Sequence, residues 1–188
     1  MLSYILRALD RGDVAALALM DLSAAFDTVD HCILLRHLCV SYGISGAALS
    51  WISSYLTDRQ QCVWHDGVQS THEFIEFRVP LGSVLGLLLF VLYTADLAPL
   101  IAEHRLHSHL YADDTQVYGW CQPTDVSLLQ DNMSRCFYDM WRWMCSNRLQ
   151  LNALKTEFIW CARHHIPDRD VQVGHDSVHP VQSALVCT

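Results

Sequence analysis

Residues 111–118 of the chain read YADDTQVY, a stretch that carries two adjacent aspartates. With the preceding LHSHL it predicts two short strands, with Asp113 and Asp114 at the turn between them. Asp is common in turns, so turn chemistry alone also explains the pair. Asp21 ends the apolar run VAALALMDL (14–22), which predicts a buried strand, with a helix as the rival interpretation. If the two strand ends meet in one sheet, their carboxylates form a site for a hard divalent cation such as Mg²⁺.

The flanking sequence predicts helices around these strands. Apolar spacing places them at about 28–40, 45–56, 83–96 and 124–145, with Ser83 as the N-cap of the third. Asp66-Gly67 predicts a hairpin turn, and TEFIWCA (156–162) predicts a final strand. Met and Trp recur on one face of the last helix, which indicates core packing rather than a cofactor site. Periodicity ends at residue 163, so 163–188 is predicted to be an irregular tail.

Composition limits the function classes. The 188 residues are 52% hydrophobic and 17% charged, which suits one globular domain with a sizeable core. A net charge of −8 argues against a protein that holds nucleic acid by a basic surface alone. The eight cysteines contain no CxxC pair, so they are predicted to be reduced, mostly buried thiols rather than zinc ligands.

The sequence also bears on location. The N-terminal segment MLSYILRALDRGD carries charge early and has no small-residue cleavage site, unlike a secretory signal. The longest apolar run, Val84–Ala95, is shorter than a membrane span and predicts a buried core helix. We therefore expect an intracellular protein, in the nucleus or cytoplasm, without a membrane partner.

Four stretches together carry a family resemblance: DLSAAFDTVDH (21–31), VPLGSVLGLLLFVLYTADL (79–97), YADDTQVY (111–118) and NRLQLNALKTEFIW (147–160). In order and spacing they resemble motifs A, B, C and D of the reverse transcriptases of non-LTR retrotransposons, of the LINE type and especially the Jockey-like group. The resemblance implies an α+β fold, the reverse transcriptase palm, in which a small antiparallel sheet is backed by helices. Residues 1–162 would be a partial reverse transcriptase domain, with the fingers mostly and the thumb wholly absent.

The resemblance also implies roles for individual residues. Asp21, Asp113 and Asp114 match the carboxylates that bind two Mg²⁺ ions, or Mn²⁺, for nucleotidyl transfer. Lys155, the only lysine in the chain, matches the motif D residue thought to protonate the leaving pyrophosphate. Phe26 matches the aromatic residue that excludes a nucleotide 2′ hydroxyl, although a Phe at a strand-to-helix turn is also explained by core packing.

Motif B is where the sequence departs from the family pattern. Gly82 and Ser83 match the loop that shapes the nucleotide pocket. Leu81 stands where the family has Gln, and Leu87 where it has Pro. The leucine at 81 cannot make the hydrogen bonds of an amide, so impaired activity is expected.

The implied activity is RNA-directed DNA polymerisation with an RNA template, a DNA primer and dNTPs as partners. The alternative is a catalytically inert relic or interaction module that keeps the palm fold. Palm surfaces left uncovered by fingers and thumb would favour self-association.

Overall fold

The computed structural model describes residues 1–75, 77–80, 82–163, 167 and 169–181. The chain forms two compact units, one made of Met1–Ser23 with Ala95–Thr188 and the other of Ala24–Thr94. The sequence predicts one domain over 1–162, because no Gly-, Pro- or Ser-rich linker marks either crossing point between the units.

The first unit is built on a four-stranded antiparallel sheet of order β6-β7-β1-β8. Its strands are β1 (Val14–Ser23), β6 (His107–Tyr111), β7 (Asp114–Cys121) and β8 (Gln150–Cys161). Seven of the ten residues of β1 are buried, which matches its central place, and its pairing with β7 and β8 excludes the rival helix. The hairpin of β6 and β7 is confirmed, while β8 begins six residues before the predicted strand.

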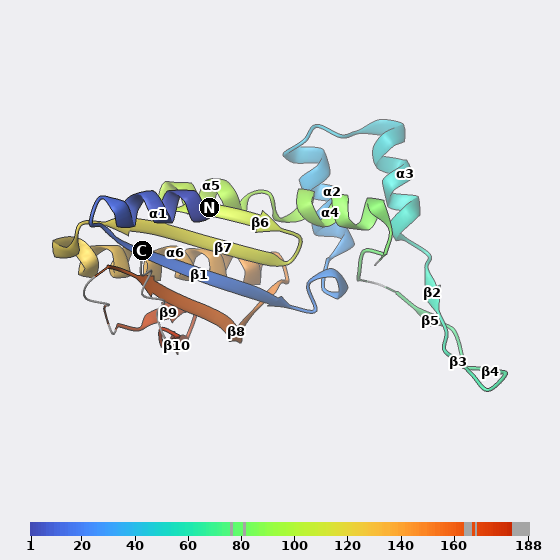
Figure 1. The fold of residues 1–188 in the computed structure, drawn as a ribbon. Coiled ribbons are helices and arrows are strands. Elements are labelled where there is room, and N and C mark those ends of the chain that lie inside the picture. Colours follow the sequence, from blue (N-terminus) through green and yellow to red (C-terminus); the bar gives the residue numbers. More distant parts are fainter. Residues whose placement is uncertain (76, 81, 164–166, 168, 182–188) are drawn as a thin grey trace. The chain divides into compact units, whose positions relative to one another are not determined.

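Helices cover both faces of this sheet (Figure 1). On one face lies α1 (Leu2–Asp10), whose Ile5 and Leu9 pack with Ala15, Leu17 and Tyr118. On the other lies α6 (Val126–Ser146), which follows the short helix η2 (Pro123–Asp125) and packs against β7 and β8. The helix α5 (Leu97–Glu103) packs against β6 and α6. The buried side of α6 confirms the predicted apolar stripe except at Trp141, which is half-buried; its buried residues are Leu129, Met133, Cys136, Phe137, Met140 and Met144.

The predicted irregular tail is wrong for its described part. Two strands, β9 (Val171–Val173) and β10 (Asp176–Val178), form an antiparallel hairpin that packs against α6 and β8. Gly174, at φ +62, makes the tight turn between them. Three-residue strands carry too little periodicity to be recognised from sequence, and this pair gains stability by burying valines against the rest of the unit.

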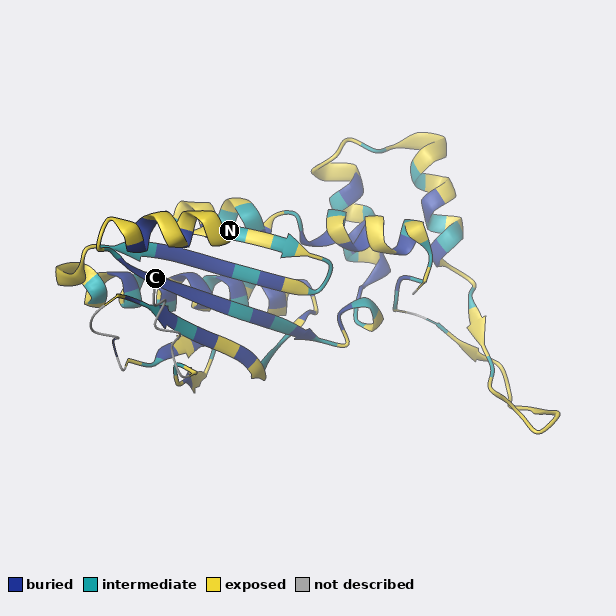
Figure 2. Cartoon of the chain, viewed as in Figure 1, coloured by how far each residue is buried: buried dark blue, intermediate teal, exposed yellow. Residues whose placement is uncertain are grey.

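The second unit contains three packed helices and a long hairpin. The helices are α2 (His31–Val40), α3 (Gly46–Leu56) and α4 (Val84–Thr94), and η1 (Ala25–Asp27) precedes them. The hairpin pairs β2 (Gln60–Gln61) with β5 (Glu73–Phe74) and, at its tip, β3 (Trp64–His65) with β4 (Val68–Gln69). Asp66 and Gly67 both have positive φ at the tip, as the sequence predicts. Figure 2 shows that nearly all of this hairpin is exposed.

Two expectations from composition need comment. Of the seven cysteines that the structure describes, all are free, but only Cys136 is buried, so the predicted burial is wrong for most of them. Among the described residues, one helical stretch, Val84–Glu103, is long and apolar enough to cross a membrane by length and composition. Chain turns at 95–96 divide it into α4 and α5, and core helices pass the same test.

Candidate active site

Three of the predicted site residues lie at the same end of the central strands. Pairing between β1 and β7 extends to Met20 opposite Thr115, one residue short of Asp21 and Asp114. Asp113 lies in the two-residue turn that joins β6 to β7, since Tyr111 pairs with Asp114. Ala112 makes this turn possible with a φ of +53, which costs a non-glycine residue some strain. The fold therefore brings two carboxylates of the hairpin next to the strand that carries Asp21.

Asp21 is paired with the single lysine of the chain. Lys155 on β8 places its Nζ 3.2 Å from Oδ2 of Asp21. The lysine side chain is 69% exposed and the aspartate side chain 23% exposed. Solvent therefore weakens the ion pair mainly at its lysine end. Oδ2 of Asp21 is itself buried and accepts no well-directed hydrogen bond from the residues that the structure describes. The ammonium of Lys155 therefore attracts this oxygen electrostatically but does not donate a directed hydrogen bond to it.

These side chains suit a hard cation, but they are not assembled around one. Carboxylate oxygens only accept, and a buried, unsatisfied Oδ2 is what a divalent cation would complete. Within the described parts of the chain, however, no three His, Cys, Asp or Glu side chains stand close enough to hold a metal ion. The structure thus pairs Asp21 with Lys155. Asp113 and Asp114 lie at the same end of the sheet, but their side chains do not form a metal-binding cluster with Asp21 in the described part of the chain.

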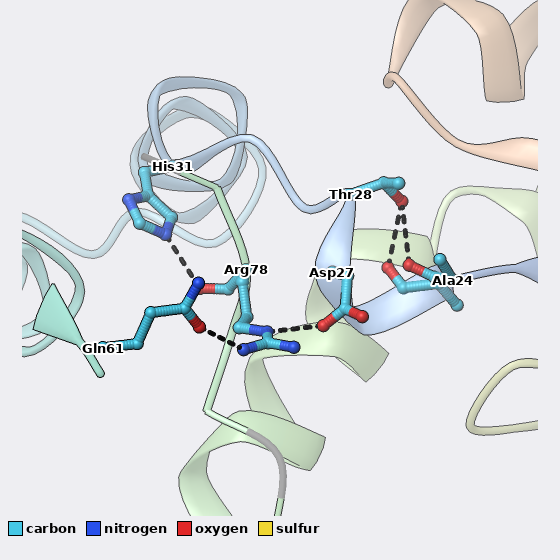
Figure 3. A network of polar contacts seen from close by, with 7 residues as sticks. Ala24, Asp27, Thr28, His31, Gln61 and Arg78 are labelled. Atoms are coloured by element: carbon cyan, nitrogen blue, oxygen red, sulfur yellow. Dashed lines mark hydrogen bonds and ion pairs between the residues drawn. The ribbon is translucent and has the colours of Figure 1, made fainter. Parts of the chain in front are cut away.

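In the second unit, Phe26 is fixed by the turn that follows β1. Ala24 adopts the left-handed region at φ +48 and starts η1, and Oγ1 of Thr28 donates to the Ala24 and Ala25 carbonyls (Figure 3). The ring of Phe26 is half-buried and lies 4.5 Å, centroid to centroid, from that of Phe90 on α4. Part of the ring remains accessible, so packing does not use all of its surface.

A polar network joins η1 to the segment before α4, and the sequence analysis missed it. The Arg78 guanidinium donates from Nε to Oδ1 of Asp27 at 2.5 Å and from Nη1 to Oε1 of Gln61 at 3.2 Å (Figure 3). Nε2 of His31 lies 2.9 Å from the Arg78 carbonyl oxygen. The hydrogen bond that Arg78 donates to the Asp27 carboxylate raises the pKa of Arg78 above its usual value. Asp27 lies 51 residues from Arg78, so only the fold reveals the pair.

The motif B loop is organised by one hydroxyl. Oγ of Ser83 donates to the Pro80 carbonyl at 2.8 Å and accepts from the Gly86 amide at 3.0 Å, which confirms Ser83 as the N-cap of α4. Since that hydroxyl proton is used, the Tyr55 hydroxyl, 2.8 Å away, donates to Ser83. Gly82 has a φ of +78, which favours glycine there. Leu81 lies outside the described residues, and Leu87 is 46% exposed on α4.

Comparison with known proteins decides the family. Residues 7–179 match the family described as reverse transcriptase (RNA-dependent DNA polymerase). The chain belongs to the reverse transcriptase family. It is 34% identical over 122 residues to the RNA-directed DNA polymerase from mobile element jockey of Drosophila funebris, which supports the Jockey-like, non-LTR resemblance. That match covers 62% of this chain and 13% of the relative.

Solved structures support the fold of this reverse transcriptase chain. Apo telomerase from Candida tropicalis, truncated from its C-terminal domain, matches with a TM-score of 0.63 at 10% identity over 95% of this chain and 38% of that one. Telomerase from Candida albicans, in complex with a TWJ fragment of telomeric RNA, matches with a TM-score of 0.61 at 12% identity over 95% and 32%. The α+β, palm-like fold is therefore confirmed, and the chain spans about a third of these structures.

Proposed function

We propose that this chain supplies the palm of an RNA-directed DNA polymerase, which extends a DNA primer with dNTPs on an RNA template. The observation that carries the proposal is the pairing of Asp21 with Lys155 beside the hairpin that carries Asp113 and Asp114. One end of one sheet thus carries carboxylates that can bind cations and an ammonium that can donate a proton to a phosphate leaving group. Both are needed for nucleotidyl transfer.

The carboxylates would hold the metal ions. Asp21, Asp113 and Asp114 offer acceptor-only oxygens, which fit Mg²⁺ and also Mn²⁺. When bound, such ions activate the primer 3′ hydroxyl and stabilise the charge on the transferring and leaving phosphate oxygens. The buried Oδ2 of Asp21 supports this role because it accepts no directed hydrogen bond from the described part of the chain. The family generally uses divalent metals.

Lys155 would be the general acid. The 3′ hydroxyl loses its proton to solvent, and its oxygen forms a bond to the α-phosphorus as the bond to the bridging oxygen of pyrophosphate breaks. A proton from the Lys155 ammonium neutralises that leaving oxygen, and the amine regains a proton from solvent. General acid catalysis of this kind contributes about 10²- to 10⁴-fold in rate. The exposure of the lysine side chain supports the role, because the ammonium can leave Asp21 for a phosphate.

Phe26, Gly82 and Ser83 would bind the nucleotide. Phe26 presents the accessible part of a ring that is held against Phe90, so it can exclude a 2′ hydroxyl sterically. Gly82 and Ser83 directly precede α4, and the Ser83 hydroxyl already has three polar neighbours. Their role is therefore to fix the shape of the loop rather than to donate to a ligand.

Primer extension on an RNA template tests the proposal. Purified protein is given dNTPs with Mg²⁺ or Mn²⁺, beside the double variant D113A/D114A and a control, E103A/D131A, that removes the same charge from exposed positions. We expect extension by the wild type and by E103A/D131A but not by D113A/D114A. Equal extension by all three proteins would show that Asp113 and Asp114 are not metal ligands.

A catalytically inert protein with the palm fold is the second candidate. It is favoured by the absence of an assembled metal cluster among the described residues. It predicts a folded wild type that extends no primer and shows no saturable Mn²⁺ binding. Saturable Mn²⁺ binding that D113A/D114A abolishes would reject it.

A further inference from the structure

β8 carries a wide bulge directly beside Asp21. Asp21 pairs with Asn152, whereas Leu19 pairs with Glu157. The single β1 residue between them, Met20, therefore faces the four β8 residues 153–156. Such a bulge adds backbone that must be held in place, since its residues lose their regular ladder partners. Lys155 belongs to this segment, so the shape of the bulge decides where its ammonium lies.

Thr156 closes the bulge. Its Oγ1 donates to the carbonyl oxygen of Asn152 at 2.9 Å. This bond links the last residue of the bulge to Asn152, the residue that directly precedes the bulge. Thr156 is only 6% exposed, and it begins the inward row that continues with Phe158 and Trp160. The hydroxyl is therefore anchored in the core, while the neighbouring Lys155 projects to solvent and to Asp21. By contrast, Leu154 within the bulge is fully exposed and anchors nothing.

We propose that Thr156 is a positioning residue, whose hydrogen bond to Asn152 holds the bulge so that Lys155 reaches Asp21. Of the other bulge residues, Leu154 and Lys155 are exposed and Ala153 is half-buried, and the Lys155 side chain is 69% exposed. The assignment of Lys155 as general acid rests on the proposed function. The placement of Lys155 by Thr156 does not, because it is a property of the resting chain.

The single lysine gives a direct readout. Lysine labelled with ¹³C at Cε yields one side-chain NMR signal, that of Lys155. D21N, in metal-free buffer, defines the signal of a lysine that has lost its ion pair. We expect T156V and T156A to shift the signal toward the D21N position, and T156S, which keeps the hydroxyl, to match the wild type.

A matched control is available in the second unit. Thr94 is also 6% exposed, and its Oγ1 donates to the carbonyl of Phe90, four residues earlier, as that of Thr156 does. T94V loses an equivalent bond and is expected to leave the lysine signal unchanged. Circular dichroism establishes that each variant is folded.

Three results would overturn the proposal. They are an unchanged Lys155 signal in T156V and T156A, an unchanged signal in D21N, and a T94V shift equal to that of T156V. If T156V and T156A fail to fold while T156S folds, the hydroxyl is needed for folding of the protein. The specific role in placing Lys155 is then also refuted.

Primer extension separates this inference from the proposed function. If the wild type extends primers, T156V should lose about 10²-fold in kcat, with little change in the KM for dNTPs, because only the placement of the acid changes. T156S should restore activity. If the wild type extends nothing, the proposed function fails, while the NMR result still decides whether Thr156 places Lys155.

Discussion

Replacing Gly86 by alanine should destabilise α4, although the same change stabilises most helices. Gly86 lies in the first turns of α4, and a Cβ there would stand 2.2 Å from the Pro80 carbonyl oxygen and 2.9 Å from Oγ of Ser83. Ordinary contact begins at 3.4 Å, so the Pro80 carbonyl would have to move by about 1.2 Å. That carbonyl accepts a hydrogen bond from the Ser83 hydroxyl, so the movement also disturbs the N-cap of α4.

The expected magnitude follows from three effects. Alanine is favoured over glycine by about 1 kcal/mol inside a helix. Overpacking against fixed backbone costs about 1–3 kcal/mol. Loss of the Ser83 cap costs about 1 kcal/mol and cancels the gain in helix propensity. G86A should therefore lose about 1–3 kcal/mol in the free energy of local unfolding, and the sign is opposite to that of an unconstrained helix.

Hydrogen exchange of peptides from α4 measures this effect within its own unit. Exchange should be faster in G86A than in the wild type. V84A serves as the control, because Val84 is 90% exposed on the same helix and its replacement should change stability by less than about 0.5 kcal/mol. Slower exchange in G86A than in the wild type would mean that the Pro80 carbonyl does not lie over Gly86, and the reasoning would fail.

The other predictions concern four separate features. D30A should cost about 1 kcal/mol in thermal unfolding, because Asp30 caps α2 by accepting from the Ile33 amide at 3.0 Å; an unchanged melting temperature would contradict this. Iodoacetamide at pH 8 should modify the exposed Cys32, Cys39 and Cys145 before Cys136, since burial raises the pKa of the Cys136 thiol to about 12. The unfolded thiol ionises first, so Cys136 should reduce stability as pH rises from about 9 toward 12, as denaturation at stepped pH would show. F26V should raise the ratio of ribonucleotide to deoxyribonucleotide incorporation in primer extension, and an unchanged ratio would assign Phe26 to packing alone. The hairpin exposes large apolar side chains, among them Trp64, which is 66% exposed, and this predicts self-association. Sizing chromatography of W64S should show a smaller species than the wild type, and a monomeric wild type would refute the prediction.

Local signals account for the parts of the fold that the sequence predicts. β1 is a continuous apolar run, and the Asp66-Gly67 turn and the Ser83 cap are set by residues within a few positions of each other. The motifs likewise identify Asp21 and Lys155 as candidates, because each stands at a recognisable place in its own stretch. What these features share is that neighbouring residues determine them.

Long-range packing accounts for the parts that the sequence does not predict. The hairpin of β9 and β10 is stable only against α6 and β8, and the Asp27–Arg78 pair joins residues 51 positions apart. The bulge in β8 is a register shift, which appears only when β8 pairs with β1. Burial of cysteines was overestimated because hydrophobic composition does not say which side of a helix each thiol takes.

The boundary between the two units divides motif A, and this has a physical consequence. Asp21 precedes the crossing at Ser23–Ala24 and is held by Lys155 from its own unit. Phe26 follows the crossing and is held by Phe90 within the other unit. The contacts that fix the two residues are therefore independent, although only five positions separate them in sequence. A change at one residue should therefore leave the described contacts of the other intact, so that under the proposed roles F26V alters nucleotide selection and D21N alters cation binding.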